Sequence, residues 1–487
     1  MYSEQARRTT ARVLFRVVDP SAKPETISTS IDESDLARME QTINNNRTIN
    51  DLFLSTKLFN DGFVIAPTEN EIENEDAEVA YVSDSMSDID GYFTANPVVE
   101  FDIGILINTL GFTMNFSDYN YPETIKISAY NGSNLLLDET LTITDSNTLW
   151  DVDLNSYNKI RVEFIKLYNP YSRAQLVEVD FGKVETFENK EIISLALDET
   201  MNLSNQTIEQ NQLSLKIEDV DKKFNILNPT GIYSYLLQKQ PFTLEFGVET
   251  IKDVFEYTEM GRFFLKEWTV SENVVDFTTR DIFYLSENTD WIPETCSDLY
   301  EFAESLMTQG SIVNYNIDNS LIGMTFVTPT EGISILKGLE YLGVASGTVV
   351  YEDRASVTQV QEIGVALQAG ISADDMYSFP KVNLKEEALG VTIKCANGDY
   401  TNGTSPIIVD CPIINAVDAP AIAIHLLDIL NLRLKYDIDW RQNPLIEVGK
   451  LSQIDNEFGE EKIAVISEQR FSFNGALSGQ TKAGGSV

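Results

Sequence analysis

Apolar and polar residues alternate along many short segments of the chain, and this period of two predicts a protein built mainly from β-strands. The longest such segment is residues 462–473, which follows a predicted hairpin turn at residues 455–459. Two shorter strands are expected before it, at residues 437–440 and 445–448, with Asn443–Pro444 interrupting the alternation between them. Together these segments predict a β domain near the C-terminal end of the sequence.

Three segments instead repeat apolar residues every three or four positions, which predicts helices. They are residues 295–309, 330–341 and 420–434. Asp298 falls in the early turns of the first helix, and Asp418 is placed to cap the last one. The first two helices and a Gly-rich strand at residues 343–351 lie between two β-rich stretches, so this part reads as an α/β insert.

Residues 92–182 contain seven or eight short strand-like segments separated by turns such as Asn131–Ser133. Strands of this number and spacing predict a jelly-roll sandwich. Beyond Gly182 five more alternating strands indicate a second β domain. They are residues 191–197, 212–218, 242–248, 261–268 and 274–280. Nearer the N-terminus, residues 11–19 predict a strand and residues 35–44 a short helix.

The length and the net charge of the chain limit the classes of protein to which it can belong. A chain of 487 residues exceeds a single hydrophobic core, so we expect three or four domains. The formal net charge of −41 repels nucleic acid, so we expect no nucleic-acid partner. The charge either maintains solubility or lines a channel through which DNA passes without being held. No apolar run approaches a membrane span, and the first residues lack a signal-peptide pattern, so we expect synthesis in the cytoplasm.

The search for catalytic or metal-binding groups finds little. Cys296, Cys395 and Cys411 are widely spaced and predict buried thiols rather than a zinc site or a disulfide framework. His425 is the only histidine and lies in an apolar helix, where a core or interface role is favoured over that of a base. The nearest match to a calcium loop, residues 84–91, lacks the later Glu of that motif. We therefore expect no cofactor, no metal and no enzyme activity.

Paired carboxylates of the glycosidase kind are also not predicted. Glu386–Glu387 and Glu460–Glu461 are adjacent pairs, whose side chains point to opposite faces if they lie on strands. Glycoside hydrolysis needs two carboxyls that face each other across a bond.

Several motifs together resemble one family. The order DW (439–440), NPLIEVG (443–449), a turn containing FG, the long strand and FNGALSG (473–479) resembles the closing β-barrel of phage tail hub-like or tail-tip (baseplate) proteins. These belong to siphophages, myophages and tail-derived bacteriocins of Gram-positive bacteria. DVDKKFNILNPTGIY (219–233) and GRFFLKEW (261–268) are also similar to the family, and the likeness extends from about residue 90 to the C-terminus.

The order PVVEFDI, GFTMNF, TIKISAY, NKIRVEFIK and AQLVEVDFG within residues 97–182 resembles a galactose-binding-like module. The implied fold class is mainly β with an α/β insert, with this jelly-roll module and two small β-barrel hub domains. Seven parts follow: an N-terminal strand and helix segment (1–60), an acidic linker (61–91), the galactose-binding-like jelly roll (92–185), the first hub barrel (186–290), the α/β insert (291–375), the second hub barrel with its helix (376–479) and a flexible tail (480–487).

The resemblance implies a structural role in a virion tail or tail-like particle. Three copies of the two barrels would form a pseudo-sixfold ring, so the expected partners are other copies of the chain, the tail tube and neighbouring baseplate proteins. A carbohydrate- or receptor-binding protein and a peptidoglycan-degrading tail enzyme are the alternatives.

Host cell-wall glycan is a further expected partner, because aromatic rings on the loops of a jelly roll can pack against a sugar. The candidate contacts are Tyr119, Tyr121, Tyr168 and Tyr171, with Asp118, Asn120 and Arg173 as polar neighbours. The alternative is that these tyrosines cover the edge of the sandwich or meet a neighbouring subunit.

Overall fold

The computed structural model describes residues 8–19, 22, 26–29, 81–117, 120–229, 231–363, 367–458 and 462–486. The chain forms two compact units. Unit 1 comprises Met1–Leu14, Thr186–Gly231 and Pro241–Val487, and unit 2 comprises Phe15–Glu185 and Ile232–Gln240. The helix predicted at residues 35–44 and most of the acidic linker predicted at residues 61–91 lie outside the described residues.

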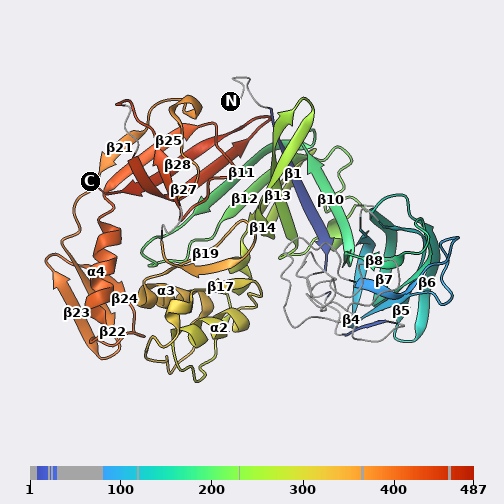
Figure 1. Cartoon of the computed structure of the whole chain (residues 1–487), viewed down its shortest axis with the longest axis horizontal. Coiled ribbons are helices and arrows are strands. Elements are labelled where there is room, and N and C mark those ends of the chain that lie inside the picture. Colours follow the sequence, from blue (N-terminus) through green and yellow to red (C-terminus); the bar gives the residue numbers. More distant parts are fainter. Residues whose placement is uncertain are drawn as a thin grey trace. The chain divides into compact units, whose positions relative to one another are not determined.

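Unit 2 is built on an antiparallel sheet with the strand order β2-β4-β7-β5-β6, in which β9 also pairs with β4 (Figure 1). A separate two-stranded sheet pairs β3 with β8. The strands are β2 (Thr26–Thr29), β3 (Tyr81–Met86), β4 (Val98–Asn115), β5 (Pro122–Asn131), β6 (Asn134–Thr142), β7 (Asn147–Leu167), β8 (Arg173–Leu176) and β9 (Glu178–Asp180). A 3-10 turn, η3 (Tyr233–Tyr235), also belongs to this unit.

Strands β4 and β7 are longer than the alternation predicts. Separate strands are expected at residues 98–103 and 111–116, whereas β4 runs without interruption from Val98 to Asn115. Strand β7 likewise spans Asn147–Leu167, where separate strands are expected at residues 148–154 and 159–168. Pairing between β4 and β7 continues across several register shifts between Asp102 and Gly111. Glycines at positive φ, Gly104 at 75° and Gly111 at 155°, allow the backbone to bulge there without ending the strand.

The core of unit 2 is aromatic. Phe101, Phe112, Phe164 and Phe181 are fully buried among aliphatic residues of the same sheet. The Phe181 ring meets those of Phe101 and Phe112 edge-on, at centroid distances of 5.6 and 6.1 Å. This packing explains why the apolar positions alternate along β4 and β7. The jelly-roll arrangement of these strands stays a prediction.

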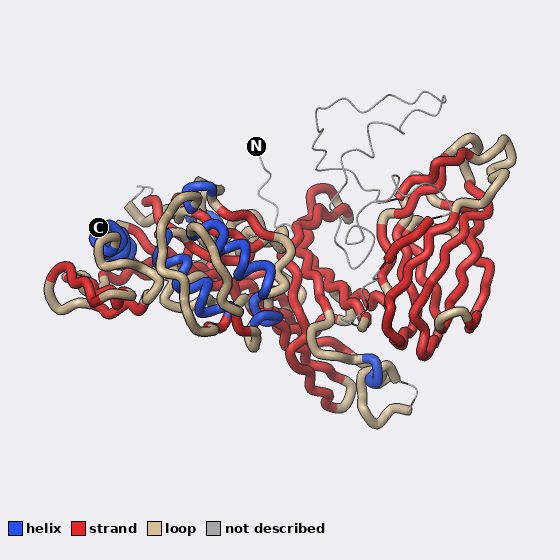
Figure 2. Tube along the Cα trace, turned by 90° about the horizontal axis from the view of Figure 1, so that it is seen from below, coloured by secondary structure: helices blue, strands red, loops and turns tan. Residues whose placement is uncertain are grey.

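One long sheet, most of whose residues belong to unit 1, has the strand order β10-β1-β13-β14-β15-β12-β11-β27-β28-β25-β21, and β26 pairs with β27. Figures 1 and 2 show that β-strands make up most of this part of the chain. The strands are β1 (Thr9–Val18), β10 (Gly182–Glu188), β11 (Ile192–Thr200), β12 (Gln212–Glu218), β13 (Pro241–Ile251), β14 (Val254–Ser271), β15 (Val274–Arg280), β21 (Lys381–Leu384), β25 (Leu434–Trp440), β26 (Leu451–Ile454), β27 (Lys462–Phe473) and β28 (Leu477–Gly485).

A single strand pair joins the two β-rich stretches that the sequence separates. Strand β11 of the first stretch pairs antiparallel with β27 of the second, and Leu195 lies opposite Phe473 and Leu197 opposite Phe471. These four side chains are buried. The two predicted β domains therefore share one continuous sheet, while their closure into two separate barrels stays a prediction.

The α/β layer of unit 1 has its own core. Its helices are α2 (Leu299–Gln309), α3 (Ile335–Ser346) and α4 (Ala419–Leu430), and its short elements are η4 (Ile282–Ser286), β16 (Asp290–Trp291), β17 (Tyr315–Ile317), η5 (Asn319–Leu321), β18 (Ile333–Ser334), β19 (Val349–Glu352), β20 (Thr358–Gln361) and η6 (Ala373–Asp375). Helix α2 begins at Leu299 rather than at the predicted residue 295, and Asp298 caps it, because its carboxylate accepts the Glu301 N–H at 3.0 Å. The Asp418 side chain, predicted to cap the last helix, makes no capping hydrogen bond. Helix α3 ends at Gly347, whose φ of 72° suits glycine.

Two predictions about the second β domain are wrong. Residues 391–395 fall within the predicted second hub barrel (376–479) and are expected to start it, but they belong to β22 (Gly390–Cys395), which pairs with β23 (Gly398–Gly403) and β24 (Ile407–Asp410) in a separate sheet. The side chains of Val391 and Ile393 are buried in the helical core. Strand β22 lies beside α4 (Figure 1). The flexible tail predicted from residue 480 is instead strand β28, which pairs with β25 and β27 as far as Gly485.

Candidate functional site

Two loops of unit 2 are tied together at the surface. The Ser87 N–H donates to the Ser172 carbonyl (2.8 Å), and the Leu167 N–H donates to the Gly91 carbonyl (2.9 Å). A side chain at Gly91 would put its Cβ 2.3 Å from the Leu167 carbonyl oxygen, so this close approach requires glycine. Residues 87–92 and 167–172 therefore form one ordered surface.

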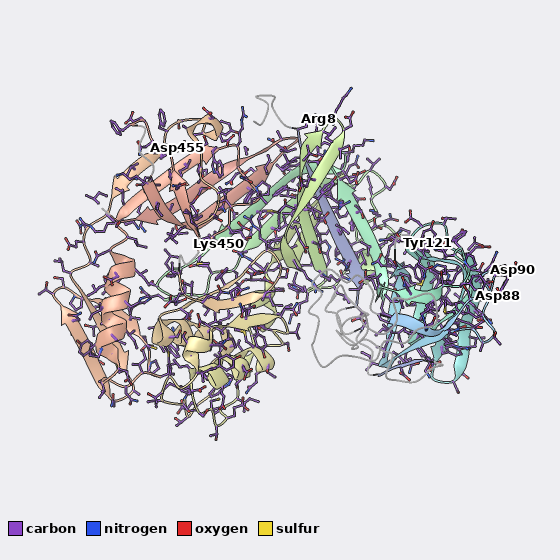
Figure 3. All side chains as sticks on the ribbon, viewed as in Figure 1. Arg8, Asp88, Asp90, Tyr121, Lys450 and Asp455 are labelled. Carbon is purple, nitrogen blue, oxygen red and sulfur yellow. The ribbon has the colours of Figure 1, made fainter. Side chains whose placement is uncertain are left out.

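Asp88 holds the first of these loops in shape. Its Oδ1 accepts the N–H groups of Asp90 and Tyr92, both at 2.9 Å. Figure 3 shows Asp88 and Asp90 together at the surface of unit 2. Asp88 therefore acts as a turn cap. Among the described residues, no group of three or more His, Cys, Asp or Glu side chains is placed to hold a metal ion.

The tied loops present aromatic side chains to solvent. Tyr92, Tyr168 and Tyr171 are 48, 47 and 54% exposed, and Ile89 is exposed beside them in sequence. The Lys166 ammonium lies 5.5 Å from the centre of the Tyr92 ring. We call Ile89, Tyr92, Tyr168 and Tyr171 the aromatic surface.

Three of the four predicted tyrosines are described, and they differ in their exposure to solvent. Tyr168 and Tyr171 belong to the aromatic surface, whereas Tyr121 is half-buried, and its ring lies edge-on to that of Tyr168 at 5.4 Å. The Tyr168 hydroxyl donates to the Ile143 carbonyl at 2.8 Å, which fixes the ring in place. Tyr119 and its neighbour Asp118 lie outside the described residues.

The predicted polar neighbours hold the loops rather than facing outward. The Asn120 amide donates to the Arg173 carbonyl (2.7 Å), and the Arg173 guanidinium donates to the Ser83 carbonyl (2.9 Å). Sequence reasoning missed Tyr92 and Ile89. The available signal was the Asp88–Gly91 turn, which places an aromatic residue directly after a tight loop.

Two of the buried carboxyls of unit 1, Asp281 and Glu352, lie on elements that meet between the sheet and the α/β layer. Asp281 accepts the N–H groups of Asn211 (2.6 Å) and Phe283 (3.3 Å), and Glu352 accepts the N–H of Ile282 (2.9 Å). Burial raises the pKa of Asp281 to about 7. Burial, together with the nearby Asp281, raises the pKa of Glu352 well above its ordinary value. Both carboxyls accept hydrogen bonds from backbone N–H groups, so their role is structural.

Arg354, in the loop between β19 and β20, forms a buried ion pair with Glu199. The Arg354 Nε donates to Glu199 Oε1 (2.7 Å), and its second terminal nitrogen donates to Glu199 Oε2 (2.6 Å) and to the Ile446 carbonyl (2.8 Å). The other terminal nitrogen donates to the Pro444 carbonyl. Arg354 therefore connects strand β11, the α/β layer and the segment NPLIEVG that resembles the tail family.

Of the three cysteines predicted to be buried, Cys411 is buried, whereas Cys296 and Cys395 are only half-buried. The Cys411 thiol donates to the Tyr341 carbonyl, and burial raises its pKa. The His425 ring packs against the turn at Gly347 that ends α3. Glu386 and Glu387 line an open groove of unit 1, while Glu460 and Glu461 lie outside the described residues.

No protein-family model matches the sequence, and no curated protein matches it significantly. Among solved structures, the chain is similar to a prophage MuSo2 tail protein from Shewanella oneidensis (13% identity, TM-score 0.41, 62% of this chain and 94% of that one). It is also similar to a tail protein from Neisseria meningitidis (11%, 0.42, 62% and 94%) and to the prophage tail protein gp18 from Listeria monocytogenes (11%, 0.38, 62% and 91%). Structural similarities with such low sequence identities and TM-scores do not assign a function to the chain.

Within the described ranges, none of the helices combines the length and apolar character that crossing a membrane requires.

Proposed function

We propose that this chain is a structural component of the tip or baseplate of a phage tail, or of a phage-derived tail-like particle. Copies of the chain assemble as a ring at the distal end of the tail tube. The observation that carries the proposal is the continuous antiparallel sheet of unit 1, in which β11 pairs with β27. This pairing gives one rigid β framework to two stretches that resemble the paired hub barrels in sequence.

The segments that resemble the tail family have structural tasks in this framework. FNGALSG forms the turn between β27 and β28, and NPLIEVG supplies the carbonyls that bind Arg354. The Trp440 side chain of the DW pair is buried, and its ring N–H donates to Thr481 (2.9 Å). The resemblance thus lies in residues that hold the sheet together.

The sheet also offers an edge for assembly. Strand β21 is the last strand of the sheet order and, in the described part of the chain, pairs with β25 alone. All four of its side chains are exposed, including Val382 and Leu384. An edge strand with exposed apolar side chains is a template for pairing with another chain. A neighbouring copy, the tail tube and a second baseplate protein are its proposed partners.

Removal of this one gene from a phage or tail particle tests the role. Negative-stain images of the purified particles are expected to lack the distal tip, and supplying the chain again is expected to restore it. Antibody labelling of complete particles is expected at the distal end of the tube. Intact tips in the deletion particles would refute the assembly role.

Glycan binding by the aromatic surface is a second proposed function. Three exposed tyrosine rings held by ordered loops suit the apolar face of a sugar. The full chain is expected to bind cell-wall glycans on an array, and Tyr168→Ala with Tyr171→Ala is expected to lose the signal. Tyr377→Ala, an exposed tyrosine of unit 1, is the matched control. An array on which the full chain gives no binding signal, or equal binding by the double variant, would refute this function.

A further inference from the structure

Two of the three cysteines lie side by side at the ends of neighbouring strands of unit 1. Strand β22 pairs in parallel with β24, and the register places Lys394 opposite Asp410 (Figure 1). The Cys411 N–H donates to the Lys394 carbonyl (3.1 Å), so the pairing continues to the next position. Cys395 and Cys411 follow Lys394 and Asp410 directly and are therefore neighbours across the two strands.

The two cysteine side chains lie on the same face of this sheet. Ile393 of β22 and Val409 of β24 are buried in the helical core. Cys395 and Cys411 occupy the next alternate positions, where Cys411 is part of that core and Cys395 packs against it. Neighbouring strands lie roughly 4.8 Å apart, which falls within the range of roughly 4.4–6.8 Å between the Cα atoms of a disulfide. The backbone thus has the spacing that a bond between the two sulfurs needs.

The two thiols differ in their access to solvent. Cys395 is half-buried, whereas Cys411 is fully buried. The Cys395 thiol donates to the Ile393 carbonyl (3.5 Å), and the Cys411 thiol donates to the Tyr341 carbonyl (3.4 Å). Thiols are weak donors, so rotation of each side chain about its Cα–Cβ bond gives up little when a covalent bond forms. A reagent in solvent reaches Cys395 first.

The pKa values of the thiols agree with this arrangement. Burial raises the pKa of Cys395, and the Tyr400 backbone N–H offsets part of the rise. Burial also raises the pKa of Cys411, and the nearby Cys395 contributes to the rise, as expected for sulfurs that lie close together. Both groups are therefore thiols at neutral pH, and they react through the small fraction that is deprotonated.

We propose that Cys395 and Cys411 form a reversible disulfide by exchange with a low-molecular-weight disulfide, with Cys395 as the attacking thiol and Cys411 as the resolving thiol. The Cys395 thiolate attacks one sulfur of the reagent and expels the other as a thiolate, which leaves a mixed disulfide on Cys395. The Cys411 thiolate then attacks the Cys395 sulfur and expels the second half of the reagent. The two expelled thiolates take up the two protons that the protein thiols lost, so the protein is oxidised and the reagent is reduced to two thiols.

The bond fastens the end of β24 to β22 and closes residues 396–410 into a covalent loop beside α4. A reducing cytoplasm keeps the two thiols apart, whereas oxidising surroundings outside a cell favour the bond. The proposal goes beyond the structural role in a tail and does not depend on it.

Oxidised glutathione and the full native chain test the proposal. The reaction is stopped with acid, and the remaining thiols are alkylated with iodoacetamide after unfolding. The count of free thiols is expected to fall from three to one per chain. A protease that cuts before Asp399 and Asp410 separates the two cysteines, so mass spectrometry is expected to find their peptides joined until a reductant is added.

Three variants assign the roles. Cys411→Ser is expected to retain one glutathione on Cys395, because the resolving thiol is missing, and Cys395→Ser is expected to retain none on Cys411. Cys296→Ser is the matched control and is expected to form the same bond, since the Cys296 thiol lies in another segment and donates to the Glu294 carbonyl. Circular dichroism spectra equal to the wild type establish that the variants fold.

The wild-type chain decides the proposal even if a variant does not fold. Three free thiols after the reaction, a bond that includes Cys296, or a mixed disulfide that persists on Cys395 while Cys411 stays free would each overturn it. A folded Cys411→Ser chain that takes up no glutathione would overturn the assignment of Cys395 as the attacking thiol. The gene-deletion particles test the tail role separately.

Discussion

Removal of the Glu199 charge tests how strongly Arg354 joins the parts of unit 1. The two side chains are 5 and 8% exposed and form a two-pronged contact of 2.7 and 2.6 Å. Glu199→Gln keeps the shape of the side chain but leaves the guanidinium in a buried site without its counter-charge. The carbonyls of Pro444 and Ile446 remain as its acceptors.

The expected loss of stability is large for a single atom change. Breaking a buried ion pair by removing one partner costs about 3–5 kcal/mol, since the other charge remains desolvated. In a domain of this size such a loss lowers the midpoint of thermal unfolding by on the order of 10 °C. The Arg354–Glu199 pair connects β11 with the segment at residues 444–446, so local protection is expected to fall there first.

Two measurements follow the effect. Differential scanning calorimetry gives the shift of the unfolding midpoint, and hydrogen exchange with mass spectrometry gives the protection of residues 444–448. Asp198→Asn is the matched control. It removes a carboxylate from the adjacent position of β11, where the exposed pair with Arg470, at 3.4 Å, contributes about 0–1 kcal/mol. A Glu199→Gln shift no larger than that of the control would refute the reasoning.

Three further predictions concern other buried positions. The pKa of Asp281 is raised to about 7 in the folded chain, whereas an Asp in the unfolded chain loses its proton above about pH 4. Because the folded chain holds this proton more tightly, the free energy of unfolding falls as pH rises between these two values. Asp281→Asn is expected to flatten that fall in melting temperatures taken from pH 4 to pH 8, and an unchanged slope would contradict the assignment. Phe112→Ala removes a fully buried ring from unit 2 and is expected to cost about 3–5 kcal/mol in urea unfolding. The exposed Leu135→Ala is its control, and similar losses in both would count against the packing described. Gly479→Ala would place a Cβ 1.8 Å from a carbonyl oxygen of the neighbouring strand β27, so amide protection in β27 and β28 is expected to drop. Gly332→Ala, where the nearest atom is at 3.4 Å, is expected to leave it unchanged.

The local periodicity of apolar residues predicts many of the strands and helices of this fold. The alternation at residues 462–473 predicts β27 with the bounds that it has, and the apolar repeat at residues 295–309 predicts α2, which begins four residues later. Such features depend on near neighbours in the chain, because a strand exposes alternate side chains and a helix needs a cap at its first turn. The exposed Tyr168 and Tyr171 were predictable for the same reason, since turn residues surround them.

The pairing of distant segments required the tertiary structure. Every strand offers the same backbone donors and acceptors, so alternation gives the buried face of a strand and not its partner. For this reason the sequence did not reveal that β11 pairs with β27, that β22 belongs to the helical core, or that residues 480–485 continue the sheet. The contact between Glu199 and Arg354, 155 residues apart, has no local signature either. The chain by itself determined which segments are strands and helices, and the folded state decided which of them meet.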